Sequence, residues 1–184
     1  FNLATIYLCI GQYDTAIASF EALLKREDLS PNEKSDLYSN LASAYMQKKN
    51  YAKGTQCALT AIQLVPNHLR SLNTLGKIHL VEKRYENAVE IFRLAVSYYD
   101  DAVESRIGLA EGLRGLKRGQ AAITELKKAS QFEIGGDDKT AFNTLCAYLR
   151  KDGKDGDAIK LEVQRELEDA DRVRKRLLAF AKSN

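Results

Sequence analysis

The stretch Leu75-Gly76-Lys77-Ile78-His79 decides the fold, because two similar stretches lie 34 residues on either side of it. Residues 41–45 read LASAY and residues 109–113 read LAEGL. Further along, small residues repeat with the same step at Gly54, Ala88 and Ala122. A period of this length is typical of stacked helical hairpins, because each hairpin needs a neighbour to bury its apolar face.

Small side chains occur where the two helices of each predicted hairpin would cross. Only Ala or Gly lets two helix backbones approach closely, and larger residues then fill the space on either side. We therefore expect small residues of the first helices to face small residues of the second helices, namely Ala4, Ala42, Gly76 and Ala110 against Ala16, Gly54, Ala88 and Ala122. Repetition of one crossing angle predicts a superhelix with a concave inner wall.

This pattern resembles the tetratricopeptide repeat, in which Trp-x2-Leu-Gly-x2-Tyr is followed by Ala-x3-Phe and a closing Pro. The second unit matches it closely, with Tyr38, Leu41, Ala42, Tyr45 and Pro66 at the expected positions. Two features depart from the pattern, since the chain has no Trp and Arg106 occupies an aromatic position.

The resemblance implies an all-α, right-handed α-solenoid in which helical hairpins follow one another along an axis. We expect four repeats within residues 1–138, at about 1–30, 35–68, 69–102 and 103–136. A divergent fifth hairpin with an extended basic C-terminal helix is expected over residues 139–184. Residue 1 falls inside the first helix of its unit, so we expect the chain to be a fragment of a longer protein.

Composition favours an intracellular domain without a membrane span. No apolar run approaches the roughly 18 residues that a helix needs to cross a bilayer. Cys9, Cys57 and Cys146 are odd in number and widely spaced, which favours reduced thiols that pack inside helices. We expect a reducing compartment, with the cytoplasm favoured and the organelle left open.

Charge is balanced in the body of the chain and concentrated at its C-terminal end. Residues 1–138 hold 17 basic and 17 acidic residues, so the net charge of +3 comes from the remainder. Binding to nucleic acid depends on clustered excess positive charge, so we do not expect nucleic acid to be a partner.

The sequence offers no catalytic constellation. It contains no HExxH motif, no phosphate-binding glycine loop and no nucleophile elbow. Of its two histidines, His68 follows a Pro-Asn pair in a loop, and His79 takes the position that Tyr7 and Tyr45 hold in earlier units. We therefore expect His79 to pack like an aromatic residue. We predict no enzymatic activity, no cofactor, no metal and no small-molecule substrate.

The residues of the inner wall follow from the register, because helix positions three and four apart share a face. This wall is polar and of mixed sign, and its candidate partner-binding residues are Asn40, Ser43, Gln47, Arg70, Asn73, Lys77, Glu111 and Arg114. Asparagine amides suit the backbone of an extended peptide, because they donate and accept at once. An ordinary solvated face would carry the same residues. Gly108 and Gly115 either soften the fourth unit or admit a partner's backbone.

Some members of the tetratricopeptide repeat family, which the chain resembles, hold the C-terminal carboxylate of a chaperone tail with two asparagines and three basic residues. The resemblance places Asn40 and Arg70 at two of these positions, whereas Phe1, Thr5 and Thr74 stand at the other three. A buried carboxylate would lack its charged partners here, so capture of such a tail is the weaker interpretation.

The C-terminal segment departs most from the repeat. After a stop expected at residues 135–138, we predict a short helix to about Arg150 and a long one to about Lys182. An apolar stripe runs along the long helix through Ile159, Val163, Leu167, Ala170, Val173, Leu177 and Ala181. The polar face of this helix suits the cap that a solenoid needs at its end. Alternatively, the helix docks on an acidic partner through Arg172, Arg174, Lys175, Arg176, Leu177 and Phe180.

These observations favour a protein–protein interaction scaffold or adaptor that belongs to a larger multiprotein assembly. Its partners would be other proteins or peptide segments in a hetero-complex. The competing interpretation is a peptide-tail receptor or co-chaperone that holds one linear segment in the concave groove.

Overall fold

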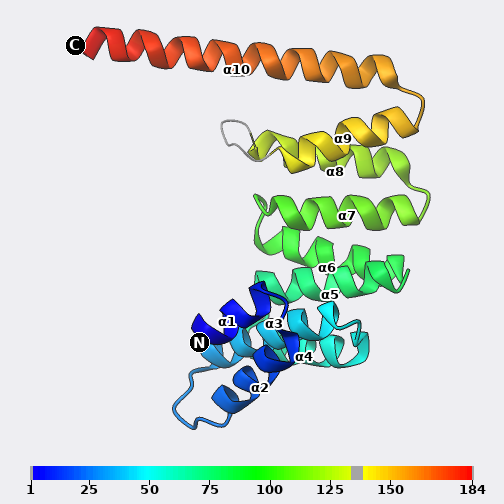
Figure 1. Ribbon diagram of the computed structural model, residues 1–184. Coiled ribbons are helices and arrows are strands. Elements are labelled where there is room, and N and C mark those ends of the chain that lie inside the picture. Colours follow the sequence, from blue (N-terminus) through cyan, green and yellow to red (C-terminus); the bar gives the residue numbers. More distant parts are fainter. Residues whose placement is uncertain (1, 134–138, 184) are drawn as a thin grey trace.

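The structure is a computed structural model that describes residues 2–133 and 139–183, leaving aside the side chains of 176–178 and 180–183. These residues form ten helices and no strand, namely α1 Asn2–Cys9, α2 Tyr13–Leu24, α3 Pro31–Gln47, α4 Tyr51–Leu64, α5 Leu69–Val81, α6 Tyr85–Tyr98, α7 Val103–Gly115, α8 Gly119–Phe132, α9 Thr140–Lys151 and α10 Asp155–Ser183. Each helix packs mainly against the next, so the chain forms an elongated α-solenoid (Figure 1). Within the described ranges, no helix is both long and apolar enough to span a bilayer.

The turn inside each hairpin has the same backbone conformation. One residue per turn has a φ between 58° and 81°, and these residues are Gly11, Lys49, Lys83, Lys117 and Gly153. After α5, the amide of Arg84 donates to the carbonyl of His79 at 2.8 Å, and equivalent bonds of 2.9 Å close the other four turns. A left-handed residue just past a helix end satisfies the last carbonyls of that helix. The first and fifth hairpins therefore turn in the same way as the three central ones.

Small residues lie at the helix crossings, as the sequence predicts. A β-carbon built on Gly54 would lie 3.3 Å from the carbonyl oxygen of Ala42, and one on Gly76 would lie 2.5 Å from Cζ of Phe92. The Phe92 ring is fully buried between α5 and α7, where it also fills the space beside Gly108. Gly115 leaves room for the ring of Tyr85 in the same way. Gly76, Gly108 and Gly115 thus accommodate aromatic rings of the chain itself.

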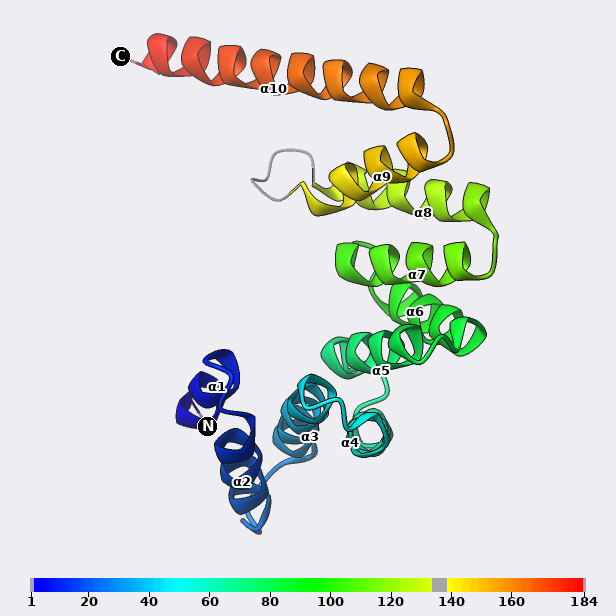
Figure 2. The same cartoon turned by 45° about the vertical axis from the view of Figure 1, so that its right-hand side comes forward.

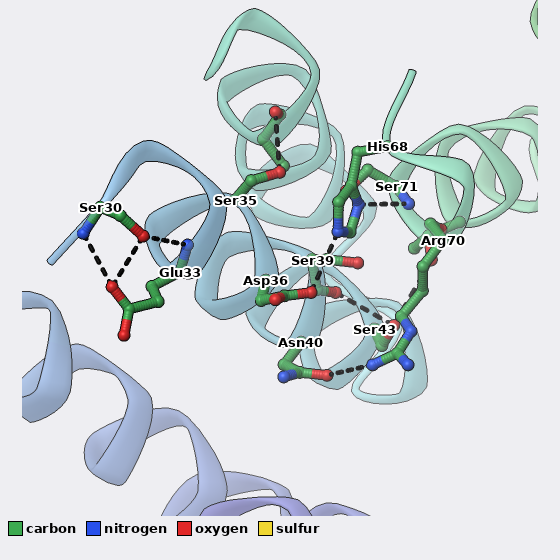
Figure 3. A network of polar contacts seen from close by, with 12 residues as sticks. Ser30, Glu33, Ser35, Asp36, Ser39, Asn40, Ser43, His68, Arg70 and Ser71 are labelled. Carbon is green, nitrogen blue, oxygen red and sulfur yellow. Dashed lines mark hydrogen bonds and ion pairs between the residues drawn. The ribbon is translucent and has the colours of Figure 1, made fainter. Parts of the chain in front are cut away.

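Polar residues fix the starts of the helices in the first half of the chain. At α3, the Glu33 amide donates to the Ser30 hydroxyl at 3.3 Å, and the Ser30 amide donates to the Glu33 carboxylate at 2.8 Å, a capping box (Figure 3). His68 caps α5 by accepting from the amide of Ser71 at 3.3 Å. The loop histidine therefore has a structural role at the helix start.

Arg106 occupies a buried position in the fourth repeat, where the pattern has an aromatic residue. The side chain is 4% exposed, donates from Nε to the carbonyl of Asp100 at 2.9 Å, and pairs with Glu125 at 2.7 Å. Its guanidinium also lies 5.8 Å from the centre of the Phe132 ring. The fourth repeat keeps its helical positions because this buried charge is both paired and hydrogen-bonded.

The fifth hairpin begins with a cap that comes from the end of α8. The Glu133 carboxylate accepts from the amides of Ala141 and Phe142 at 2.6 and 3.0 Å, which satisfies the first donors of α9. α10 begins at Asp155, so Gly156 lies in its first turn. The stop expected at residues 135–138 lies outside the described residues. Figure 2 shows α10 extending well past the end of α9.

Candidate functional site

The first helices of the central hairpins form the inner wall of the stack. α3 lies against α5, and α5 lies against α7 (Figure 2). Two hollows on this wall share Lys77, Leu80 and Glu111, and together they reach from Gln47 on α3 to Ile107 on α7. We call this continuous depression the inner groove. It crosses three repeats and presents both apolar and charged side chains.

Polar side chains of the predicted wall join α3 to α5. Asn40 Oδ1 accepts from Arg70 Nη1 at 3.2 Å, and the hydroxyls of Ser43 and Thr74 lie 3.4 Å apart. Beside them, Nε2 of His68 lies 3.1 Å from Oδ1 of Asp36 (Figure 3). The wall residues therefore hold neighbouring repeats in register as well as facing the groove.

The amide of Asn73, the second predicted asparagine, forms hydrogen bonds between α5 and α7. Asn73 Nδ2 donates to Glu104 at 2.9 Å, and the Ser105 hydroxyl donates to Asn73 Oδ1 at 2.6 Å. Asn73 is 4% exposed and Asn40 is 2% exposed. We predicted Asn40 and Asn73 as candidate partner-binding residues of the inner wall, and in the structure their amides lie against the neighbouring helix. Within the described part of the chain, Nδ2 of Asn40 has no hydrogen-bond partner.

Four of the predicted residues are exposed, namely Gln47, Arg70, Lys77 and Glu111, and all of them except Arg70 line the inner groove. Although Glu111 is exposed, partial desolvation by the groove walls raises the pKa of its carboxyl, an effect that Lys77 opposes. Arg114 is half-buried, because its guanidinium lies 4.2 Å from the centre of the Tyr148 ring and donates to Asp152 at 3.2 Å. Arg114 thus joins α7 to α9.

The histidines and thiols show packing roles. His79 is 7% exposed, as expected for a packed side chain, and burial lowers its pKa, with Arg84 acting in the same direction. Burial raises the pKa of Cys57 to about 11 and also raises that of Cys146, whereas Cys9 is exposed. Among residues 2–133 and 139–183, no three His, Cys, Asp or Glu side chains form a group that could hold a metal ion.

The C-terminal helix carries part of the second predicted surface. Arg172 pairs with Asp169 at 3.3 Å and Lys175 pairs with Asp171 at 2.7 Å, while Arg174 is exposed. The side chains of Arg176, Leu177 and Phe180, which complete the prediction, lie outside the described residues.

The apolar stripe of α10 faces away from the body. Ile159, Val163, Leu167 and Val173 are 55%, 51%, 66% and 57% exposed. The face toward α9 contains Ala158, Leu161 and Arg165, of which Ala158 is fully buried and Arg165 is 6% exposed. The helix ends the stack, but it does so with its apolar side outward, whereas we expected a polar outer face.

Curated proteins resemble the chain over part of their length. It is 24% identical over 123 residues to BBSome complex member BBS4 of Bos taurus, which covers 67% of this chain and 23% of that protein. It is 35% identical over 77 residues to the uncharacterized protein ycf37 of Cyanophora paradoxa, covering 40% of this chain and 45% of that protein. The chain spans less than half the length of these relatives.

Solved structures share the fold. MamA (residues 41 to the end) from Desulfovibrio magneticus RS-1 has a TM-score of 0.71 at 15% identity, covering 92% of this chain and 93% of that one. A putative kinesin light chain from Podosopora anserina with nearly identical TPR-like repeats has a TM-score of 0.71 at 18% identity, covering 94% of each chain.

The family model for the tetratricopeptide repeat matches residues 1–67 and 40–103, which together make up more than half of the chain. The match covers the repeats in which the structure shows small residues at the helix crossings. The chain therefore belongs to the tetratricopeptide repeat family.

Proposed function

We propose that the chain is a protein-interaction scaffold or adaptor within a multiprotein assembly, and that it contacts partners through the inner groove and α10. The inner groove carries this proposal, because it crosses three repeats and exposes Gln47, Lys77 and Glu111 along one path. A partner that follows this path would contact several repeats at once. A groove on stacked helices is also rigid before binding, which lowers the entropic cost of association.

Buried neighbours position the exposed charges of the inner wall. Asn40 accepts from Arg70, and Asn73 donates to Glu104, which also pairs with Lys77. The two asparagines thus act on a partner through the charges that they orient. A groove in which Lys77 lies among the carboxylates of Glu104 and Glu111 suits a partner segment of mixed charge, since complementary charges determine register and specificity.

The second proposed surface is the cationic end of α10, with Arg172, Arg174, Lys175, Arg176, Leu177 and Phe180. It would bind an acidic protein surface. The chain would act by binding alone, without a cofactor or small-molecule substrate, and nucleic acid would not be a partner. The balanced charge of residues 1–138 supports that exclusion. Free thiols at Cys57 and Cys146 favour a reducing, intracellular location.

A charge reversal in the groove tests the scaffold proposal. Lys77→Glu combined with Gln47→Ala changes two exposed side chains of the groove, and Arg93→Glu makes a similar charge change at an exposed residue of α6. The tagged protein would be purified from its own cells through a salt wash, and co-purifying proteins would be quantified. We expect the groove variant to lose specific partners that the Arg93 variant keeps. Equal partner sets for both variants and the unmodified chain would contradict a role for the groove.

The alternative function is a receptor for one linear peptide. The continuity of the groove favours it, because an extended segment could lie along Lys77, Leu80 and Glu111. A scaffold should co-purify with folded partners that bury interfaces of standard size, whereas a receptor should purify without a partner and bind an isolated synthetic segment.

Deletion of residues 168–184 tests the second proposed surface, the cationic end of α10. Full assembly with unchanged stability would exclude a docking role for that part of α10.

A further inference from the structure

The outward stripe of α10 begins at Ile159, a position that neighbouring hairpins cover elsewhere in the stack. Ile159 corresponds to Val89 on α6 and to Ile123 on α8, which are 4% and 2% exposed. Val89 lies under α7, where a β-carbon on Gly112 would be 2.9 Å from it. Ile159 itself is 55% exposed. At Ile159 the stripe therefore presents a packing position with no helix on it in the described structure, and Val163 and Leu167 extend this exposed apolar surface where α6 has the exposed polar residues Arg93 and Ser97.

Charge is divided between the two halves of α10. Residues 155–171 contain seven acidic and two basic residues, a net charge of −5, whereas residues 172–184 contain five basic residues and no acidic one. The helix of 29 residues is about 43 Å long and continues past α9 (Figure 1). It thus combines an exposed apolar stripe with a negative half and a positive half.

We propose that two copies of the chain dimerise through their α10 helices, packed antiparallel with the apolar stripes together. The inference rests on the proposed docking role of α10 and identifies its acidic partner as the negative half of α10 in a second copy. An antiparallel pair places each positive half over a negative half. A parallel pair would place like charges together, which is destabilising.

One register satisfies both the packing and the charges. With Ala170 at the two-fold axis, its small side chain lets the two helices approach closely. Glu166 of one copy then lies opposite Arg174 of the other, and each contact occurs twice because the interface is isologous. Neither Glu166 nor Arg174 takes part in an ion pair within the described residues, whereas Arg172 and Lys175 are already paired with Asp169 and Asp171.

Sedimentation equilibrium of the full chain, with a charge-exchange series, tests the proposal. The unmodified chain should be a dimer at micromolar concentration. Glu166→Arg and Arg174→Glu should each raise the dimer dissociation constant by at least about tenfold, since each brings like charges together twice. The double variant Glu166→Arg/Arg174→Glu should restore dimerisation, because the opposite charges face each other again.

Glu168→Arg is the matched control, because it makes the same charge change two residues away. The Glu168 carboxylate lies beside Gln164, which donates to it at 3.0 Å, and both residues line a hollow between α10 and the α8–α9 pair. This variant should keep the dimer. A monomeric unmodified chain, equal losses for Glu166→Arg and Glu168→Arg, or failure of the double variant would each overturn the proposal.

A cysteine at the predicted axis tests the register independently. Ala170→Cys, in a chain with the exposed Cys9 replaced by Ser, should join two copies by a disulfide when oxidised glutathione is added. Gln164→Cys lies off the stripe and should stay unlinked. Equal cross-linking at both positions would exclude this register. Unchanged partner sets in the groove variant together with an intact dimer would contradict the groove's role in the scaffold function alone, so the two proposals fail separately.

Discussion

The hairpins α5–α6 and α9–α10 place very different residues at equivalent positions. Ala88, Phe92 and Ala95 on α6 correspond to Ala158, Glu162 and Arg165 on α10. The three residues on α6 are fully buried. On α10, Glu162 bonds to Arg150 with both carboxylate oxygens at 2.7 Å, and Arg165 donates to the carbonyls of residues 130 and 133 at 3.3 and 3.0 Å.

The difference shows that one backbone arrangement can be maintained by two kinds of interaction. In the central hairpin, close contact between Phe92 and the glycines of α5 and α7 decides how the helices pack. In the last hairpin, hydrogen bonds and ion pairs hold a helix whose most apolar side is exposed. Packing contacts are insensitive to salt, whereas exposed ion pairs weaken as salt screens them.

The largest expected effect comes from removing the aromatic ring at the centre of the stack. Phe92→Ala should lower the free energy of unfolding by about 3–5 kcal/mol, because the fully buried ring leaves a cavity that two helices cannot close. Urea unfolding followed by circular dichroism would measure this loss, which should be the same in low and high salt. Tyr98→Ala, at a side chain that is 46% exposed, should change stability little. Similar losses for both variants would contradict the central role of Phe92.

The next effect concerns the space that Gly76 leaves for this ring. Gly76→Ala should destabilise the chain by about 1–3 kcal/mol, because the added methyl group overlaps a ring that has no room to move. Gly156→Ala is the control, since nothing lies within 4 Å of its β-carbon position. That variant should gain up to about 1 kcal/mol, because Ala favours a helix over Gly. A gain for Gly76→Ala would show that the packing tolerates displacement of the ring.

In the last hairpin, Arg165→Ala should destabilise α10 without destabilising the central hairpin. The buried guanidinium bonds to two carbonyls and lies 5.2 Å from the centre of the Phe142 ring. Its removal should lower the free energy that protects α10 amides from hydrogen exchange by about 1.5–3 kcal/mol, while α5 and α6 keep their protection. Arg174→Ala, at an exposed position, should leave α10 protected in the monomer. Loss of protection along the whole chain would contradict the separation of the two regions.

The smallest effect is a pH dependence in the central hairpin. Burial, aided by Arg84, lowers the folded-state pKa of His79 below its unfolded value. The unfolded state therefore binds the proton more readily, so the contribution of neutral His79 is complete above the unfolded pKa of about 6.5 and is lost as the pH falls from there through the lower folded-state pKa. His79→Tyr, the residue found at positions 7 and 45, should remove this component from urea unfolding measured across the range. An unchanged pH profile would contradict the assignment.

The sequence was sufficient to predict the hairpins because the repeats present the same signal several times. Gly54, Ala88 and Ala122 mark one crossing in three copies, and the structure places small residues at these crossings as expected. A feature that occurs in a single repeat is not supported by repetition in the sequence. Arg106 replaces an aromatic residue in a single repeat and finds its partners in a loop and on α8.

The inner wall and α10 were harder to predict for a related reason. Helical periodicity places Asn73 on the inner face, but it does not show that Ser105 and Glu104 of the next repeat engage its amide. For α10, amphipathicity alone predicts that the apolar stripe packs inward. The structure differs because the opposite face carries Arg165 and Glu162, whose partners lie in α8, α9 and the segment after α8. Such pairs join residues that are far apart in the sequence, so no local sequence pattern indicates them.

The left-handed residue in every hairpin turn makes the junctions between helices interchangeable. Lys49, Lys83 and Lys117 have φ values within 2° of one another, and each is followed by a helix that starts two residues later. Excision of residues 50–83 would join Lys49 to Arg84 with the same backbone geometry on both sides of the cut. An array of this kind can gain or lose a whole unit in one genetic event, so its length, and with it the number of surfaces it offers, can evolve independently of the remaining repeats.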